Sequence, residues 1–117
     1  MRTVSFYQTS SGRAPAQDFM DSLSDKERKK IYWVLKIVQE REPVPIRYLK
    51  KLVDTAGLWE VRAEYAGQAF RLLGFFDGPL LVILTNAFSK KTAHTPLSEI
   101  QIAQERRRDY LMRKGKR

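Results

Sequence analysis

The chain has no cysteine, a single histidine and no long apolar run. Without cysteine, disulfide scaffolds, cysteine-ligated zinc and thiol nucleophiles are excluded. One histidine also excludes the common multi-histidine metal sites, so we expect no metal and no cofactor, with only a carboxylate site left open. Neither a signal peptide nor a membrane-spanning segment is present, which predicts a cytoplasmic protein with no membrane partner.

What the chain has in excess is positive charge. Its 117 residues carry a formal net charge of +9, and nine basic but only three acidic residues fall within residues 89–117. Hydrophobic residues make up 43% of the chain, enough for a core, so wholesale disorder is excluded. We interpret residues 1–117 as a single basic domain. Such a domain is expected to bind an acidic partner, which is a nucleic acid, an anionic membrane surface or an acidic protein.

The hydrophobic pattern changes period along the chain. Pro15 suits the first turn of a helix, and Ser24 with Glu27 forms a capping box that opens a second helix, which Pro43 and Pro45 end. Alternating or continuous apolar residues elsewhere indicate strands. The predicted strands are residues 2–8, 58–65, 69–76 and 80–88.

A last helix follows the strands, with Thr95 as its N-cap and Pro96 at its first position. Its inner face is expected to use Ile100, Ala103 and Tyr110. The order predicts an α+β domain: a small, mostly antiparallel sheet of about four strands, with two N-terminal helices and one C-terminal helix packed on one face. The last few residues are expected to fray.

Two arginines are expected to face each other across the central strands. A two-residue turn at Ala66-Gly67 would place Arg62 directly opposite Arg71, on the same face of the sheet. Opposed like charges destabilise a ladder by up to about 1 kcal/mol. A phosphate clamp gives a reason for them, because each guanidinium offers a planar fork of donors. The alternative is an ordinary polar face on which acidic neighbours neutralise Arg62; those neighbours are Glu60 and Glu64.

Further candidates follow the apolar strand that ends at residue 88. Lys90 and Lys91 would add positive charge beside the arginines, and repulsion between them would lower a lysine pKa toward the range of proton transfer. His94 is the one side chain whose ordinary pKa lies near 7. The alternative is a pair of solvated loop lysines and a surface histidine.

The last helix carries a second basic group, for which we expect non-specific attraction to RNA. Arg106, Arg107 and Lys114 represent this group as candidate RNA-binding residues. The full set also contains Arg108, Arg113, Lys116 and Arg117.

Three ordered strings resemble one known family. They are Gly57-Leu58-Trp59-Glu60-Val61-Arg62, then Phe70-Arg71-Leu72-Leu73 with Phe75-Phe76, then Ala87-Phe88-Ser89-Lys90-Lys91-Thr92 with Thr95-Pro96. Together they resemble the phage-derived, HigB-like branch of the RelE/ParE toxin superfamily over nearly the whole chain. The resemblance implies a RelE-like fold and a toxin of a type II toxin–antitoxin pair. It also identifies Arg71 and Lys91 as the closest matches to the functional basic positions.

Such toxins are usually ribosome-dependent mRNA endonucleases, so the resemblance implies an enzyme whose partners are the ribosome, mRNA and a cognate antitoxin, often of the helix-turn-helix type. The expected reaction is metal-independent attack of a 2′-OH on the adjacent phosphate, with Arg62 and Arg71 holding the phosphate, Lys90 or Lys91 adding charge, and His94 or Glu60 moving protons. Nothing in the sequence requires a homo-oligomer. Two alternatives stay open: a ParE-like inhibitor of DNA gyrase, and a plain basic RNA-binding module.

Overall fold

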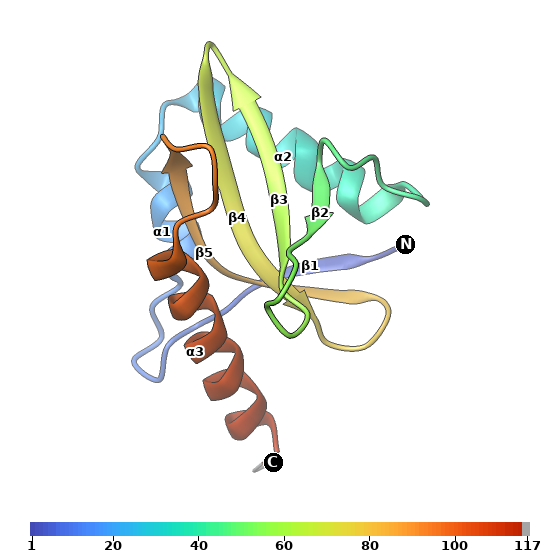
Figure 1. Ribbon diagram of the computed structural model, residues 1–117, viewed down its shortest axis with the longest axis vertical. Helices are drawn as coiled ribbons and strands as arrows, with labels where there is room; N and C mark the ends of the chain where they lie inside the picture. The colour runs from blue at the N-terminus through green and yellow to red at the C-terminus, as the bar shows by residue number, and fades with distance from the viewer. Residues whose placement is uncertain (116–117) are drawn as a thin grey trace.

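The computed structural model describes residues 1–115, and residues 116–117 lie outside the described part of the chain. The fraying predicted for the last few residues therefore falls largely outside it, and helix α3 continues to Lys114. The described residues form five strands and three helices in the order β1, α1, α2, β2, β3, β4, β5, α3, and Figure 1 labels them along the chain. Their bounds are β1 Thr3–Phe6, α1 Pro15–Asp21, α2 Asp25–Glu40, β2 Leu49–Lys51, β3 Trp59–Tyr65, β4 Gln68–Phe76, β5 Leu81–Lys90 and α3 Leu97–Lys114.

The α+β class and the mostly antiparallel sheet are confirmed. The sheet order is β1-β5-β4-β3-β2, in which only β1 and β5 pair in parallel. The extra strand is β2, only three residues long, which pairs with the first half of β3. Its shortness explains why no alternating pattern revealed it, since alternation is recognised over about four to eight residues.

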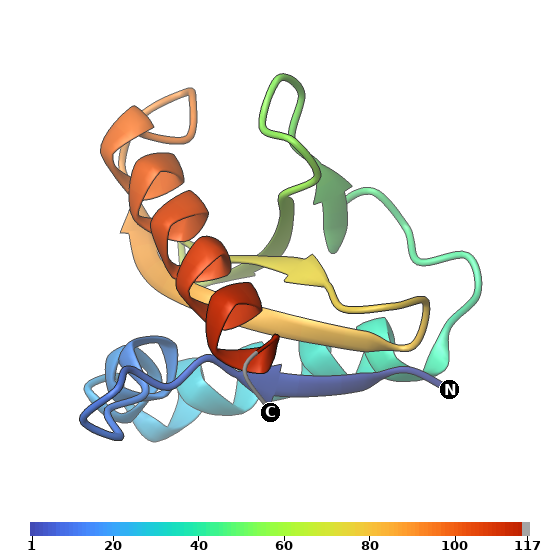
Figure 2. The same cartoon turned by 90° about the horizontal axis from the view of Figure 1, so that it is seen from below.

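The helices cover both faces of the sheet, so their predicted placement on one face is wrong. Helices α1 and α2 lie on one side and α3 on the other, as Figure 2 shows. One core contains Met20 and Val34 from the first two helices with Phe70 from β4. The other places Ala103 of α3 against Phe75 and its neighbours. Central strands buried on both faces read as continuous apolar runs, which conceals how the helices divide between the faces.

The helix signals were predicted with one error. Ser24 and Glu27 form both hydrogen bonds of the capping box, and Pro15 is the first residue of α1. Helix α3, however, begins at Leu97 with Pro96 at the N-cap, one residue later than predicted. Thr95 does not cap the helix because its hydroxyl is used elsewhere, as described below. Within residues 1–115, no helix is both long and apolar enough to cross a membrane.

The β3–β4 hairpin fixes the register of the central sheet. Its turn consists of Ala66 and Gly67, which both have positive φ, as a two-residue hairpin turn requires. Farther along β4, the pairing with β5 shifts between Leu73 and Gly74. A side chain at Gly74 would collide with the carbonyl oxygen of Ile83, so glycine is what permits this close approach of the two strands.

Candidate functional site

Arg62 and Arg71 are direct partners across the β3–β4 ladder, as the two-residue turn predicts. Both lie on the sheet face that α3 covers. Arg71 is buried, with 4% of its surface exposed, whereas 27% of the Arg62 side chain is exposed. Arg71 therefore lies within the sheet and Arg62 reaches solvent. Burial lowers the pKa of the Arg71 guanidinium, and repulsion from Arg62 acts in the same direction.

A buried carboxylate lies between the two arginines. Glu60 is only 2% exposed, and its Oε1 lies 3.5 Å from Nε of Arg62 and 3.6 Å from Nε of Arg71. Its other oxygen, Oε2, accepts a hydrogen bond from the hydroxyl of Thr95. The neutralising role considered for Glu60 is thus real, but one carboxylate is shared by two cations. The same residue also ties the loop before α3 to the arginine pair.

The arginine pair retains hydrogen-bonding capacity. Neither Nε of Arg62 nor Nε of Arg71 has a hydrogen-bond partner in residues 1–115, because both ion pairs to Glu60 exceed hydrogen-bond length. One terminal nitrogen of Arg71 donates to the carbonyl of Phe70 at 2.9 Å, which fixes the side chain against its own strand. Buried donors without acceptors are costly in a purely structural role. Of the two arginines, Arg62 lines the pocket described below, where an anionic ligand can approach its guanidinium.

Lys90 and Lys50 extend the positive surface on either side. Lys90 is the last residue of β5, paired with Ala69 of β4, so it belongs to a strand and not to a flexible loop. Desolvation lowers the pKa of the Lys90 ammonium, and repulsion from Arg71 lowers it further. Lys50 pairs with Glu60 across the β2–β3 ladder and also repels Lys90. Sequence reasoning missed Lys50 because it missed β2.

A pocket of about 270 Å³ opens over this cluster. Its lining combines cations with apolar side chains from the segment after β2 and from α3, and the loop before α3 contributes as well. The lining residues are Lys50, Lys51, Leu52, Val53, Glu60, Arg62, Lys90, Ala93, His94, Thr95 and Ile100.

The other predicted catalytic residues are placed differently. His94 is exposed and lines the pocket, and its backbone carbonyl accepts a hydrogen bond of 2.7 Å from the hydroxyl of Thr92. Lys91 is exposed just beyond the end of β5 and does not line the pocket. The structure thus brings together Arg62, Lys90 and His94 over the buried Arg71, and leaves Lys91 to one side.

The predicted RNA-binding residues of α3 all contact their own protein. Arg106 donates to the carbonyl of Thr85 at 2.9 Å, and Arg107 donates to the carbonyl of Ala56. Lys114 forms an ion pair with Asp77. These three cations help attach α3 to the sheet and to nearby turns, so only part of the charge on this helix remains available to a nucleic acid.

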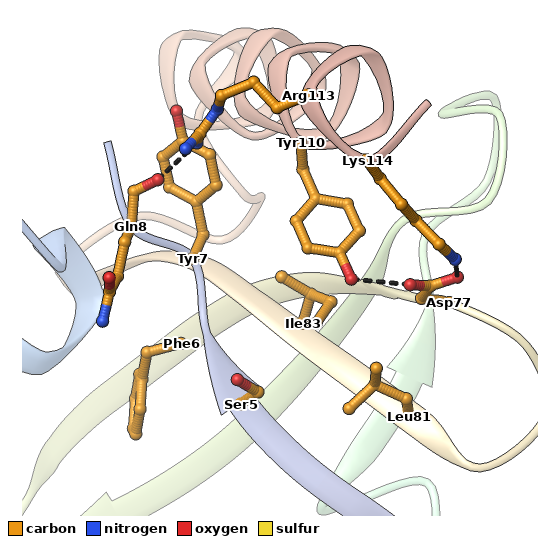
Figure 3. A pocket seen from close by; sticks show the side chains of 10 residues that line it. All are labelled: Ser5, Phe6, Tyr7, Gln8, Asp77, Leu81, Ile83, Tyr110, Arg113 and Lys114. Carbon is orange, nitrogen blue, oxygen red and sulfur yellow. Dashed lines mark hydrogen bonds and ion pairs between the residues drawn. The ribbon is translucent and has the colours of Figure 1, made fainter. Parts of the chain in front are cut away.

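A larger cavity, of about 610 Å³, lies between β1, β5 and the C-terminal half of α3 (Figure 3). Its charges are already compensated: Asp77 pairs with Lys114 and accepts from the Tyr110 hydroxyl, and Arg113 pairs with Asp109. Because these charges are paired, the larger cavity attracts an anion only weakly. The smaller pocket is therefore the better candidate for binding phosphate. Within residues 1–115, no three His, Asp or Glu side chains gather as a metal site would require.

Comparison with known proteins places the chain in a family. The family described as Phage derived protein Gp49-like (DUF891) matches residues 18–108, from within α1 to within α3. The chain belongs to the Gp49-like family. This is a RelE/ParE-like toxin family of toxin–antitoxin systems, so the coarse assignment made from the sequence is confirmed. The match to the Gp49-like family includes every residue of the arginine–carboxylate cluster and the pocket. No curated protein matches the chain.

The geometry predicts an unusual titration for Lys90. We expect its Nζ to lose its proton below the ordinary lysine pKa of 10.5, because the group is desolvated and faces Arg71 and Arg62. Replacing Arg71 with Met removes the charge that repels Lys90 most strongly and should raise the pKa of Lys90 toward 10.5. Lysine-selective ¹³C NMR titration measures both values. A Lys90 pKa that is ordinary, or that does not respond to Arg71→Met, would contradict the proposed cluster.

Proposed function

We propose that this Gp49-like protein is a HigB-like toxin that cleaves mRNA on the ribosome. The observation that carries the proposal is the cluster around Glu60: Arg62 and Arg71 share this one buried carboxylate, and two further cations, Lys50 and Lys90, lie beside them at a pocket. Such an excess of fixed positive charge, held on rigid strands, suits a phosphodiester whose charge grows during reaction. A structural role does not require it.

In the proposed reaction the 2′-oxygen of a nucleotide attacks the adjacent phosphorus, and the bond from phosphorus to the 5′-oxygen breaks. The products are a 2′,3′-cyclic phosphate and a 5′-hydroxyl. Arg62 and Lys50 stabilise the negative oxygens of the phosphorane at the pocket wall. Arg71 is a buried positive charge below the pocket, and its ion pair with Glu60 leaves less of that carboxylate's charge to neutralise Arg62.

Two groups at the pocket can move the protons. His94 accepts the proton of the 2′-hydroxyl, and Lys90, whose pKa is lowered, donates a proton to the leaving 5′-oxygen. Glu60 is unsuited to either step, since one of its oxygens faces two arginines and the other accepts from Thr95. The proposal therefore drops Glu60 as an acid or base, and keeps it as the residue that positions the arginines.

The ribosome supplies what this exposed site lacks. His94 lies on the rim of an open pocket, and nothing in residues 1–115 fixes its ring by a hydrogen bond. Holding the 2′-hydroxyl in line with the scissile bond contributes several kcal/mol to catalysis. A partner that grips the message can provide this orientation, which supports ribosome dependence.

An RNA-binding module would use the same charge differently. Such modules stack bases on exposed sheet aromatics. On the face that carries the arginines, Phe75 and Phe88 are 1% and 9% exposed, so neither ring offers a stacking surface. The charge–pocket arrangement favours phosphate chemistry. The proposed partners are therefore mRNA, the ribosome and an acidic cognate antitoxin. The first test for the antitoxin is whether it neutralises the toxin.

A purified translation system tests the reaction. Adding the protein to translating ribosomes with a defined mRNA should generate fragments with 5′-hydroxyl and 2′,3′-cyclic phosphate ends, and the same mRNA without ribosomes should stay largely intact. End-specific kinase and ligase reactions identify the termini. Fragments bearing 5′-phosphates would contradict 2′-oxygen attack, and an intact message on translating ribosomes would contradict the proposed activity.

A further inference from the structure

A threonine attaches the loop before α3 to the buried carboxylate of the site. The hydroxyl of Thr95 donates to Oε2 of Glu60, although the two residues lie 35 positions apart in the chain. A threonine at the start of a helix commonly caps it, but Pro96 is the N-cap of α3 and the helix begins without a side-chain cap. The hydroxyl of Thr95 therefore serves the carboxylate and not the end of the helix.

This hydrogen bond holds the carboxylate in an orientation that leaves the arginines incompletely paired. A carboxylate that faces a guanidinium commonly accepts two parallel N–H bonds, one on each oxygen. At Glu60, Oε2 is engaged by Thr95. The other oxygen, Oε1, is shared, and it lies 3.5 Å from Nε of Arg62 and 3.6 Å from Nε of Arg71. Both distances exceed hydrogen-bond length, so each arginine keeps an unused Nε donor.

Of the two arginines, Arg62 is the one with freedom to move toward a released carboxylate oxygen. Its side chain is 27% exposed, whereas that of Arg71 is buried and donates to the carbonyl of Phe70 at 2.9 Å. Without the hydroxyl of Thr95, Oε2 of Glu60 would lose this donor. A buried carboxylate oxygen gains most from a charged donor, so Arg62 would turn toward it and offer less charge to a phosphate in the pocket.

The same hydrogen bond fixes the backbone next to His94. Within the loop, Thr92 donates to the carbonyl of His94 at 2.7 Å, whereas Thr95 connects the loop to strand β3. Pro96 has a fixed φ and restricts the conformation of the residue before it, so the backbone on either side of Thr95 has little freedom. Glu60, His94 and Thr95 all line the pocket. One hydrogen bond thus acts on both the charge and the histidine of the site.

We propose that Thr95 is a positioning residue for the cleavage reaction, an inference that rests on the function proposed above. Its hydroxyl keeps Glu60 from pairing fully with Arg62, so that the arginine retains donors and charge for the scissile phosphate. It also keeps the loop that carries His94 beside the cluster. Thr95 acts through these residues and not on the reacting atoms.

The test compares variants of Thr95 that differ in the hydroxyl. Thr95→Val removes it at nearly the same shape, and Thr95→Ser keeps it. The probe is thymidylyl(3′→5′)thymidine, which has one phosphodiester but no 2′-hydroxyl, so the proposed reaction cannot cleave it. In an NMR titration, Thr95→Val should weaken binding about fivefold, the effect of roughly one hydrogen bond, and Thr95→Ser should bind within about twofold of the parent.

A spectroscopic signature separates positioning from a general loss of stability. Arginine-selective ¹⁵N labelling reports the Nε–Hε group of Arg62, which has no hydrogen-bond partner within residues 1–115. In Thr95→Val its proton resonance should move to lower field, because the group gains a hydrogen bond to Glu60, and in Thr95→Ser it should stay in place. A merely structural role would lower the melting temperature without moving this resonance. Thr95→Ala is a second variant without the hydroxyl and should behave as Thr95→Val does.

Thr92→Val is the matched control, because its hydroxyl lies in the same loop but contacts the carbonyl of His94 and not Glu60. It should keep the affinity for the dinucleotide within about twofold of the parent. Melting curves establish that each variant is folded.

Equal losses of affinity for Thr95→Val and Thr95→Ser would overturn the proposal, and so would equal losses for Thr95→Val and Thr92→Val. An Arg62 resonance that does not move in Thr95→Val would also overturn it. A parent chain that does not bind the dinucleotide would contradict the proposed phosphate site instead, and the Arg62 resonance would still decide the role of Thr95. Since the titration contains no mRNA or ribosome, its outcome is independent of the proposed cleavage activity.

Discussion

Arg71→Ala is expected to abolish growth arrest when the protein is induced in bacterial cells, and to slow mRNA cleavage by about 10²–10³-fold, the loss typical of removing one group that stabilises a transition-state charge. Two effects add. The buried charge beneath the pocket is lost, and Glu60, released from Arg71, pairs with Arg62 alone. Arg62 would then present less positive charge to the phosphate.

The comparison needs variants that separate charge from folding. Arg71→Met keeps the buried volume of the side chain and should be as inactive as Arg71→Ala while remaining folded. Arg108→Ala removes an exposed cation outside the pocket, whose contribution is at most non-specific attraction to RNA, and should retain most of the activity. Cleavage by a folded Arg71→Met variant at the original rate would show that the charge of Arg71 is not needed for the reaction.

Glu60→Gln is expected to be the most destabilising single change at the site. It leaves Arg62 and Arg71 opposed across the ladder with no carboxylate between them. Breaking a buried ion pair costs about 3 kcal/mol, the lower end of the usual range because Arg62 is partly exposed. For a domain of this size that lowers the melting temperature by on the order of 10 °C. Urea denaturation measures the free energy of unfolding directly.

A double variant tests the cause. If repulsion between the arginines is responsible, Glu60→Gln combined with Arg71→Met should be more stable than Glu60→Gln alone, because one of the two unpaired charges is gone. Additive losses would indicate that Glu60 acts only by packing. A Glu60→Gln variant as stable as the parent would show that the carboxylate does not hold the arginines together.

The arginine pair could be predicted from sequence because it depends on local rules. A two-residue turn at Ala66 and Gly67 fixes the register, and the register fixes the face, so Arg62 and Arg71 follow by counting. Lys90 and His94 were likewise located because a continuous apolar strand ends beside them. Each of these residues was found within one hairpin or strand end.

What the sequence did not reveal depends on contacts between distant segments. Lys50 joins the site only because the three-residue strand β2 pairs with β3. Thr95 reads as a helix cap, yet its hydroxyl reaches Glu60, 35 residues away. Arg106 looks like a surface cation, but it donates to a carbonyl of β5. The periodicity of apolar residues predicts which face of a strand or helix a residue occupies. It does not predict which residue from a distant segment contacts it on that face.

Mapping mRNA 5′ ends after induction in bacterial cells tests the central claim most directly, with Arg71→Met and Arg108→Ala induced in parallel. The account predicts new 5′ ends within translated reading frames for the parent chain and Arg108→Ala, and none for Arg71→Met. The same map gives the codon preference of the toxin. Growth arrest with intact messages and damaged DNA would contradict the account and indicate inhibition of gyrase.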